Sequence, residues 1–191
     1  MTHTSRMSIT LAAVWLLSGC ALLEPRAKND APTNVNVSER GAGYALLYDL
    51  ATQQKHSNLL SLIKKETPEL KALLERISKT SQATATELET LAKMSPPLNL
   101  KVTHLPRIEQ ATRDSIAKET SKEILRSNGV EMELTMVSSQ LSGMNYAAHL
   151  ARSLALVEGN ARRKEFLQRT DRTYSELHDQ VYKMLSARYL R

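Results

Sequence analysis

Apolar side chains recur every three or four residues along the C-terminal half of the chain, over residues 134–155 and again over residues 167–184. This spacing places them on one side of an α-helix. Narrow seams of this kind favour shallow crossing angles between helices, as in left-handed bundles. The first series is Leu134, Val137, Leu141, Met144, Ala148, Ala151 and Ala155, and the second is Leu167, Thr170, Tyr174, Leu177, Val181 and Met184. The small alanines of the first series predict close approach to a neighbouring helix.

Helix start and stop signals divide the rest of the chain. A first helix is expected over about residues 42–66, with Leu46, Leu47, Leu50, Leu59, Leu60 and Ile63 as its apolar set. Thr67 followed by Pro68 is a typical restart, so the second helix covers residues 68–94 and uses Leu70, Leu73, Ile77, Leu88 and Leu91. Ser95-Pro96-Pro97 ends it.

A crossover without helix signals then leads to a third helix from Pro106, which Asn128-Gly129 closes as a left-handed cap. Gly159-Asn160 separates the fourth helix from the fifth. No segment alternates as a strand does. The expected fold is therefore all-α, a four- or five-helix bundle of up-down type.

The N-terminus has a different character. Arg6 precedes residues 9–17 (ITLAAVWLL), an apolar run whose length as a helix is about 14 Å. That run is too short to span a bilayer but has the length of a signal-peptide core. It leads directly into Leu17-Ser18-Gly19-Cys20, which contains the single cysteine of the chain. These residues resemble the lipobox of bacterial lipoproteins. The alternative is an apolar N-terminal helix with a buried cysteine.

The lipoprotein resemblance implies a specific chemistry at Cys20. Its thiol would carry diacylglycerol, the signal peptidase would cut between Gly19 and Cys20, and the new amine would be N-acylated, typically with palmitate. Ala21, rather than aspartate, follows Cys20. By the same resemblance this favours the periplasmic face of the outer membrane. The expected organisation is a signal peptide (1–19), a lipid-anchored flexible tether (20–41) and a helical bundle domain (42–191).

Charge and cysteine content restrict the partners. The chain has a formal net charge of +6. For an exported protein, nucleic acid explains this poorly, and anionic lipid, an acidic envelope polymer or an envelope protein is the more plausible partner. The densest basic cluster is Arg162, Arg163 and Lys164. It is interpreted as a docking site for anionic lipid or an envelope polymer, or as charge that solvates a turn. A lipidated Cys20 leaves no thiol for disulfides or catalysis.

A metal site is the main alternative to a binding role, because the helix layout is faintly similar to ferritin-like exported bundles. Their carboxylate sites use Glu-x-x-His pairs. None occurs here, so the resemblance covers layout alone and no metal ligands are assigned. A looser site that brings together His56, His149 and His178 with a carboxylate such as Glu158 is left open.

Catalytic motifs are also missing from the sequence. There is no G-x-S-x-G, and Gly41-Ala42-Gly43 is interpreted as a flexible joint between tether and bundle. The pairs Glu87/Glu89 and Glu131/Glu133 are interpreted as solvated surface. No catalytic or cofactor-binding residue is assigned. The expected function is therefore a lipid-anchored envelope protein acting as a binding or structural accessory, with a ferritin-like metal-binding bundle as the alternative.

Overall fold

The computed structural model describes residues 35–58 and 65–189. The chain divides into two compact units, residues 1–30 and residues 31–191, and all described residues belong to the second. The predicted signal peptide, Cys20 and most of the predicted tether therefore lie outside the described residues. The buried apolar residues that form the core lie between Tyr44 and Val181 in the sequence. Residues 31–191 thus contain a hydrophobic core of their own, and we expect them to fold without residues 1–30.

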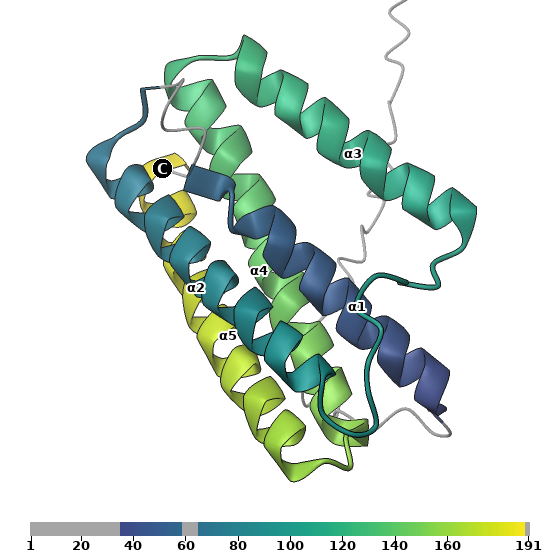
Figure 1. Ribbon diagram of the computed structural model, residues 1–191. Coiled ribbons are helices and arrows are strands. Elements are labelled where there is room, and N and C mark those ends of the chain that lie inside the picture. The colour runs from purple at the N-terminus through teal and green to yellow at the C-terminus, as the bar shows by residue number, and fades with distance from the viewer. Residues whose placement is uncertain (1–34, 59–64, 190–191) are drawn as a thin grey trace, which may run out of the picture. The chain divides into compact units, whose positions relative to one another are not determined.

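The described residues form five helices and no strand, which confirms the all-α prediction (Figure 1). They are α1 (Val37–Gln54), α2 (Pro68–Ala92), α3 (Arg107–Arg126), α4 (Gly129–Val157) and α5 (Ala161–Tyr189). The last four agree closely with the predicted ranges. Gly129 has a φ of +56°, as expected of the left-handed residue between α3 and α4.

The first helix differs from its prediction at both ends. It begins at Val37 rather than at residue 42, because Asn36 and Glu39 form a capping box. The Asn36 side chain accepts a hydrogen bond from the Glu39 N–H (2.9 Å), and the Glu39 carboxylate accepts one from the Asn36 N–H (3.0 Å). Residues 37–41 are therefore helical rather than part of a flexible tether. α1 ends at Gln54 rather than at residue 66. Residues 59–64, with the predicted apolar Leu59, Leu60 and Ile63, lie outside the described residues.

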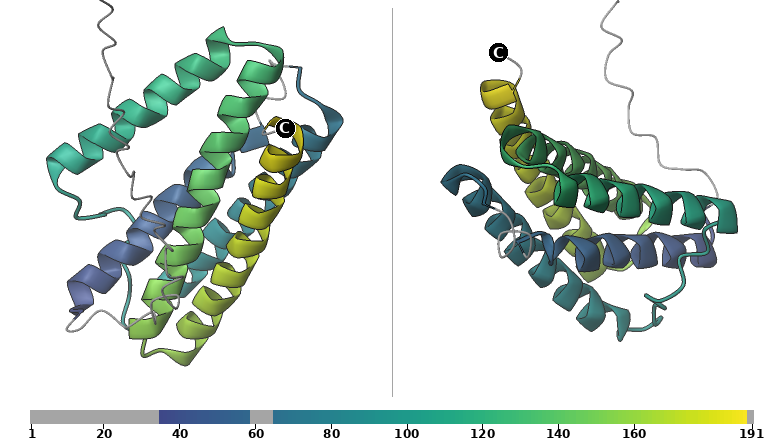
Figure 2. Two further views of the ribbon diagram at one scale, coloured as in Figure 1. Left: turned by 180° about the vertical axis from the view of Figure 1, so that it is seen from behind. Right: turned by 90° about the horizontal axis from the view of Figure 1, so that it is seen from above.

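Neighbouring helices run antiparallel, and the direction alternates along the chain from α1 to α5 (Figures 1 and 2). This alternation is the order of an up-down arrangement. The closest association is the hairpin of α4 and α5. α1 packs against both α2 and α4, and α2 also contacts α5, so these four helices surround the core. α3 packs against α4 on the outside of this group.

The core follows the predicted seams with one extension. On α5, Leu167, Tyr174, Leu177 and Val181 are buried as predicted. On α4, Leu134 is instead 38% exposed, and Met132, Met136, Ala147 and Leu154 join the buried set. This helix packs against α1, α3 and α5, so its buried surface is wider than one narrow seam.

Gly41-Ala42-Gly43 is not a flexible joint, because it lies inside α1. Gly43 is buried, and a Cβ atom there would lie 2.6 Å from Cδ2 of Leu154. A Cβ on Gly143 of α4 would likewise lie 2.7 Å from Nε2 of Gln54. Two glycines thus permit close approach of α1 and α4.

α3 is the least integrated helix. Ile124 is its buried residue, whereas Ile108 is 81% exposed and Ile116 is 62% exposed. Ion pairs within the helix support it, including Arg113–Glu109 (2.8 Å) and Lys122–Glu119 (2.6 Å). None of the helices in the described part of the chain is both long enough and apolar enough to span a membrane.

Candidate functional site

A groove on the described surface lies where the segment after α2 crosses α1 (Figure 1). We call it the crossover groove. Its volume is about 560 Å³, within the range of about 300–1,000 Å³ that is typical of ligand pockets. It is open to solvent along its length. It is lined by Tyr48, Glu89, Ala92, Lys93, Leu98, Asn99, Leu100 and Lys101.

The crossover segment is held in place by local backbone bonds and by apolar packing. Pro96 and Pro97 cannot continue the hydrogen-bond ladder of α2. The Leu98 N–H instead turns back to donate to the Ala92 carbonyl (2.9 Å). Leu98 and Leu100 are partly buried and pack against the core. Their side chains form an apolar wall of the groove.

A buried arginine on α5, Arg163, binds the backbone at the start of the same segment. The Nη2 atom of Arg163 donates to the carbonyl oxygens of Leu91 (3.1 Å), Met94 (2.8 Å) and Pro96 (2.6 Å). These carbonyls end α2 and begin the crossover, where the helix dipole is negative and a cation is favourable. Arg163 is fully buried, so the predicted exposed cluster is wrong at this residue. Arg162 and Lys164 are exposed as that prediction requires.

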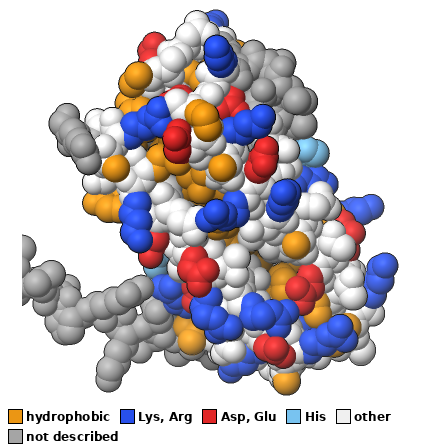
Figure 3. Space-filling view, turned by 90° about the vertical axis from the view of Figure 1, so that its left-hand side faces the viewer, with side chains coloured by type: hydrophobic (Ala, Val, Ile, Leu, Met, Phe, Trp, Pro, Cys, Tyr) orange, Lys and Arg blue, Asp and Glu red, His pale blue; other side chains and the backbone are white. Residues whose placement is uncertain are grey.

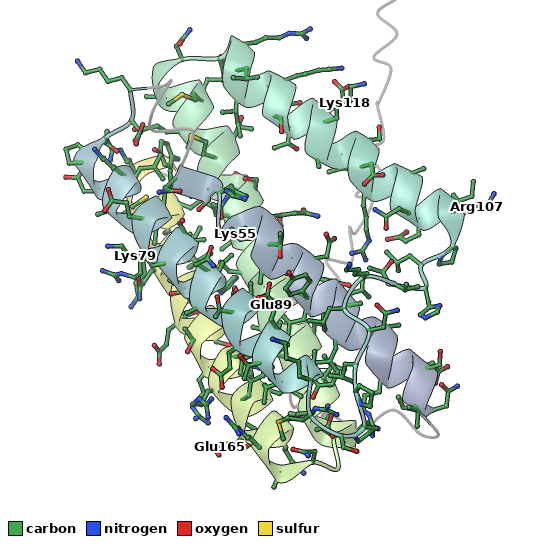
Figure 4. The ribbon with its side chains drawn as sticks, in the orientation of Figure 1. Lys55, Lys79, Glu89, Arg107, Lys118 and Glu165 are labelled. Atoms are coloured by element: carbon green, nitrogen blue, oxygen red, sulfur yellow. The ribbon has the colours of Figure 1, made fainter. Side chains whose placement is uncertain are left out.

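Another part of the groove lining, formed by Tyr48 and Glu89, links α1 to α2. The Tyr48 hydroxyl donates to Glu89 Oε1 (2.7 Å), and Glu89 lies on α2 near α1 (Figure 4). This hydrogen bond, together with partial burial, raises the pKa of Tyr48. Glu89 is exposed, as its interpretation as solvated surface requires, and it also accepts this hydrogen bond from a neutral hydroxyl.

The groove is lined by two lysines and one carboxylate, that of Glu89, so its formal net charge is +1. Lys93 and Lys101 are exposed, and neither forms an ion pair with a described residue. Ala92, Leu98 and Leu100 supply apolar surface beside them. The groove can therefore accommodate a group that combines apolar surface with negative charge.

A second polar cluster lies at the end of the bundle where α4 leads into α5. The carboxylate of Glu158 is buried, and its Oε2 accepts a hydrogen bond from the Tyr44 hydroxyl (2.7 Å). Burial first, and this hydrogen bond second, raise the pKa of Tyr44. Arg40 approaches the same oxygen (3.9 Å). The cluster fixes the first turns of α1 on the α4–α5 turn.

The histidines considered as metal ligands are not brought together. His56 follows α1 and is exposed, as is His149 on α4, and His178 on α5 lies 3.4 Å from Asp179. Within residues 35–58 and 65–189, no group of three His, Cys, Asp or Glu side chains could hold a metal ion. Glu158, the carboxylate considered with them, is bound to Tyr44 instead.

Among the four carboxylates of the two predicted pairs, Glu133 departs from the prediction. Glu87 forms an ion pair with Arg169 (2.7 Å), and Glu131 is exposed. Glu133 is only 4% exposed, because it joins three helices through Thr67 and Tyr189. Interpreting that pair as solvated surface was wrong for Glu133.

Apart from Glu89, the residues of the groove were not singled out from the sequence, which predicted a crossover without helix signals over residues 96–105. The available signal was weak: Leu98 and Leu100 are apolar residues in a segment without helix signals, and lysines lie on either side of them. Comparison of the chain with protein-family models, with curated proteins and with solved structures finds no match.

Proposed function

We propose that this chain is a lipid-anchored lipoprotein of the cell envelope whose helical bundle acts by binding, as an accessory protein. The observation that carries the proposal is Leu17-Ser18-Gly19-Cys20, placed directly after the apolar residues 9–17. Diacylglycerol on the Cys20 sulfur and an acyl chain on its amine hold the protein at the membrane, since two or more chains anchor durably where one does not. The proposed location is the periplasmic face of the outer membrane, because Ala21 follows Cys20.

The crossover groove supports the binding part of the proposal. Its two exposed lysines lie beside an apolar wall, and this wall is positioned by the buried Arg163. The matching ligand is an acidic segment of another envelope protein that also carries apolar side chains. Charge on the rim of such a site contributes mainly to specificity and to the rate of association.

The anchor is tested by metabolic labelling with a fatty acid in cells that make the full chain. The wild type is expected to incorporate label and to appear as a processed form. Cys20→Ser is expected to accumulate as an unlabelled precursor, because both lipidation and cleavage require the thiol. A processed Cys20→Ser protein, or an unlabelled wild type, would show that the leader is not of the lipoprotein kind.

The groove is tested by photo-crosslinking in cells, with the reactive amino acid at the exposed Asn99 and, as the control, at the exposed Lys79 on α2. We expect one discrete protein adduct from position 99, identified by mass spectrometry, and none of that size from position 79. Lys93→Glu combined with Lys101→Glu should reduce the adduct at least about tenfold through loss of charge complementarity. An adduct that persists unchanged in this double variant would contradict the assigned ligand chemistry.

A further inference from the structure

The first turns of α1 are fixed to one end of the bundle. Arg40 donates to the Val157 carbonyl (3.4 Å), and Tyr44 donates to Glu158 (2.7 Å), so α1 begins beside the turn between α4 and α5. Asn36, which caps α1, is where the described chain starts to form this helix. We call this the anchor-side end, and define it by Asn36, Arg40 and the α4–α5 turn with the first turn of α5.

The position of α1 matters because the proposed lipid is on Cys20, upstream of Asn36. The residues between them span at most about 55 Å even when fully extended. A chain anchored through Cys20 therefore leaves the membrane surface and enters the bundle at the anchor-side end. This step rests on the proposed function.

The anchor-side end carries exposed positive charge. Arg162 and Lys164 lie in the first turn of α5, are exposed, and form no ion pair with any described residue. The nearby acids are engaged: Glu39 in the capping box of α1, and Glu165 with Arg169 (3.0 Å). Lysine and arginine side chains also gather toward the lower end of the face in Figure 3, the end at which α4 leads into α5 in Figure 1.

Arg162 and Lys164 lie at the end of α5 where the helix dipole disfavours positive charge. The N-terminus of a helix carries partial positive charge, and acids are favoured there. The first turn of α5 contains no acid. The side chain of Asn160 caps the helix by accepting a hydrogen bond from the Arg163 N–H (3.1 Å). The helix thus forms at some electrostatic cost to the isolated protein, and an anion outside this end would relieve that cost.

We propose that the anchor-side end is a docking surface for the anionic phospholipid headgroups of the membrane that holds the acyl anchor. Arg162 and Lys164 are its principal contacts. Basic residues near an anionic surface are attracted to it over roughly a Debye length, about 8 Å at physiological ionic strength. Docking of this end would set the orientation of the bundle, with the end formed by the α3–α4 connection directed away from the lipid.

The test uses residues 31–191, which lack the lipid and the leader, and measures co-sedimentation with vesicles. One set of vesicles is pure phosphatidylcholine, and the other is an equal mixture with phosphatidylglycerol. We expect binding to the mixed vesicles only, lost at high salt. Arg162→Glu with Lys164→Glu should weaken it at least about tenfold. The matched control is Lys79→Glu with Lys183→Glu, which changes two exposed lysines elsewhere by the same charge and should retain most of the binding.

A stability measurement separates loss of docking from loss of fold. Because acids are favoured at a helix N-terminus, Arg162→Glu with Lys164→Glu should leave Tm unchanged or raise it while binding falls. Equal loss of binding in both double variants, or equal binding to both kinds of vesicle, would overturn the proposal. The two proposals can fail separately. If residues 31–191 bind the mixed vesicles but Cys20 of the full chain takes up no fatty acid, the lipid anchor is refuted and the docking surface is retained.

Discussion

At the scale of single residues, Gly43 shows how tightly α1 lies on α4. It is buried in the middle of a helix, where glycine is unfavourable by roughly 0.5–1 kcal/mol relative to alanine. A Cβ atom there would lie 2.6 Å from Leu154, whose side chain is itself in the core. Gly41, one half-turn earlier, has no atom within 4 Å of its Cβ position.

This contrast predicts opposite effects for the same substitution. Gly41→Ala should increase the free energy of unfolding by about 0.5–1 kcal/mol, because the helix gains propensity and nothing obstructs the methyl group. Gly43→Ala should decrease it by about 1–3 kcal/mol, because overpacking against Leu154 outweighs that gain. Chemical denaturation of both variants measures the two values. Stabilisation by Gly43→Ala would show that Leu154 can move aside and that the contact is not tight.

At the scale of elements, α3 differs from the other four helices. It buries Ile124, contacts α4 and leaves Ile108 and Ile116 largely in solvent. A further link to the body is Arg113, which lies over the Tyr146 ring (5.1 Å) and donates to the Tyr146 hydroxyl (3.2 Å). Few buried apolar contacts imply a low free energy of local opening.

Amide hydrogen exchange is therefore expected to be faster in α3 than in its neighbours. We expect the amides of residues 110–122 to show at least about tenfold lower protection than those of residues 144–155 in α4, because α3 can open while the core remains closed. Tyr146→Phe removes the hydroxyl that Arg113 contacts and should lower protection in α3 further, with little change in α5. Equal protection in α3 and α4 would contradict this division of the structure.

At the scale of the whole molecule, Glu133 closes the end of the bundle opposite the α4–α5 turn. It lies on α4 and accepts hydrogen bonds from the Thr67 N–H at the start of α2 (2.5 Å) and the Tyr189 hydroxyl at the end of α5 (2.8 Å). Burial alone would raise the pKa of this carboxyl, but the bonds from Tyr189 and Thr67, with Arg188 nearby, lower it below 4.5. Burial, with the bond to Glu133, raises the pKa of Tyr189 to about 12.

The lowered pKa of Glu133 predicts a pH dependence of stability. Its contribution is present above pH 4.5, the ordinary value, and is lost as the pH falls through the lower folded value, because protonation removes the charge that Thr67, Tyr189 and Arg188 stabilise. Glu133→Gln should cost about 1–2 kcal/mol at pH 7 and progressively less as the pH falls below 4.5. Glu131→Gln, on the exposed side of the same turn, is the control and should change stability little. A Glu133→Gln deficit that does not depend on pH would contradict the assignment.

Most of the helical architecture could be predicted from the sequence, because its signals are local. Thr67-Pro68, Asn128-Gly129 and Gly159-Asn160 each mark a helix boundary through backbone preferences that need no distant partner. The start of α1 was missed although its capping box, Asn36 with Glu39, was present in the sequence. The glycines and polar residues after it do not form an apolar seam, so periodicity gave no signal there.

The candidate site could not be predicted in the same way, because its geometry depends on contacts between distant residues. Arg163 appears in the sequence as the middle of three cations, and local charge gives no reason to separate it from Arg162 and Lys164. It is buried only because the helical phase of α5 directs it at the end of α2, whose carbonyl groups it caps. The groove is then lined by Leu98 and Leu100, which follow the capped carbonyls in the chain, together with Tyr48 of α1.

The sequence by itself therefore determined most of the helix boundaries and the order of the helices, since helix signals depend on neighbours within a few positions. The lipobox-like pattern around Cys20 is local in the same sense. Only the tertiary structure decided which charged residues are buried, where α1 begins its contact with the α4–α5 turn, and which surface the crossover segment forms. Those outcomes depend on residues such as Tyr44 and Glu158, far apart in the chain, meeting across the bundle. Their energy is gained only when the helices are already packed.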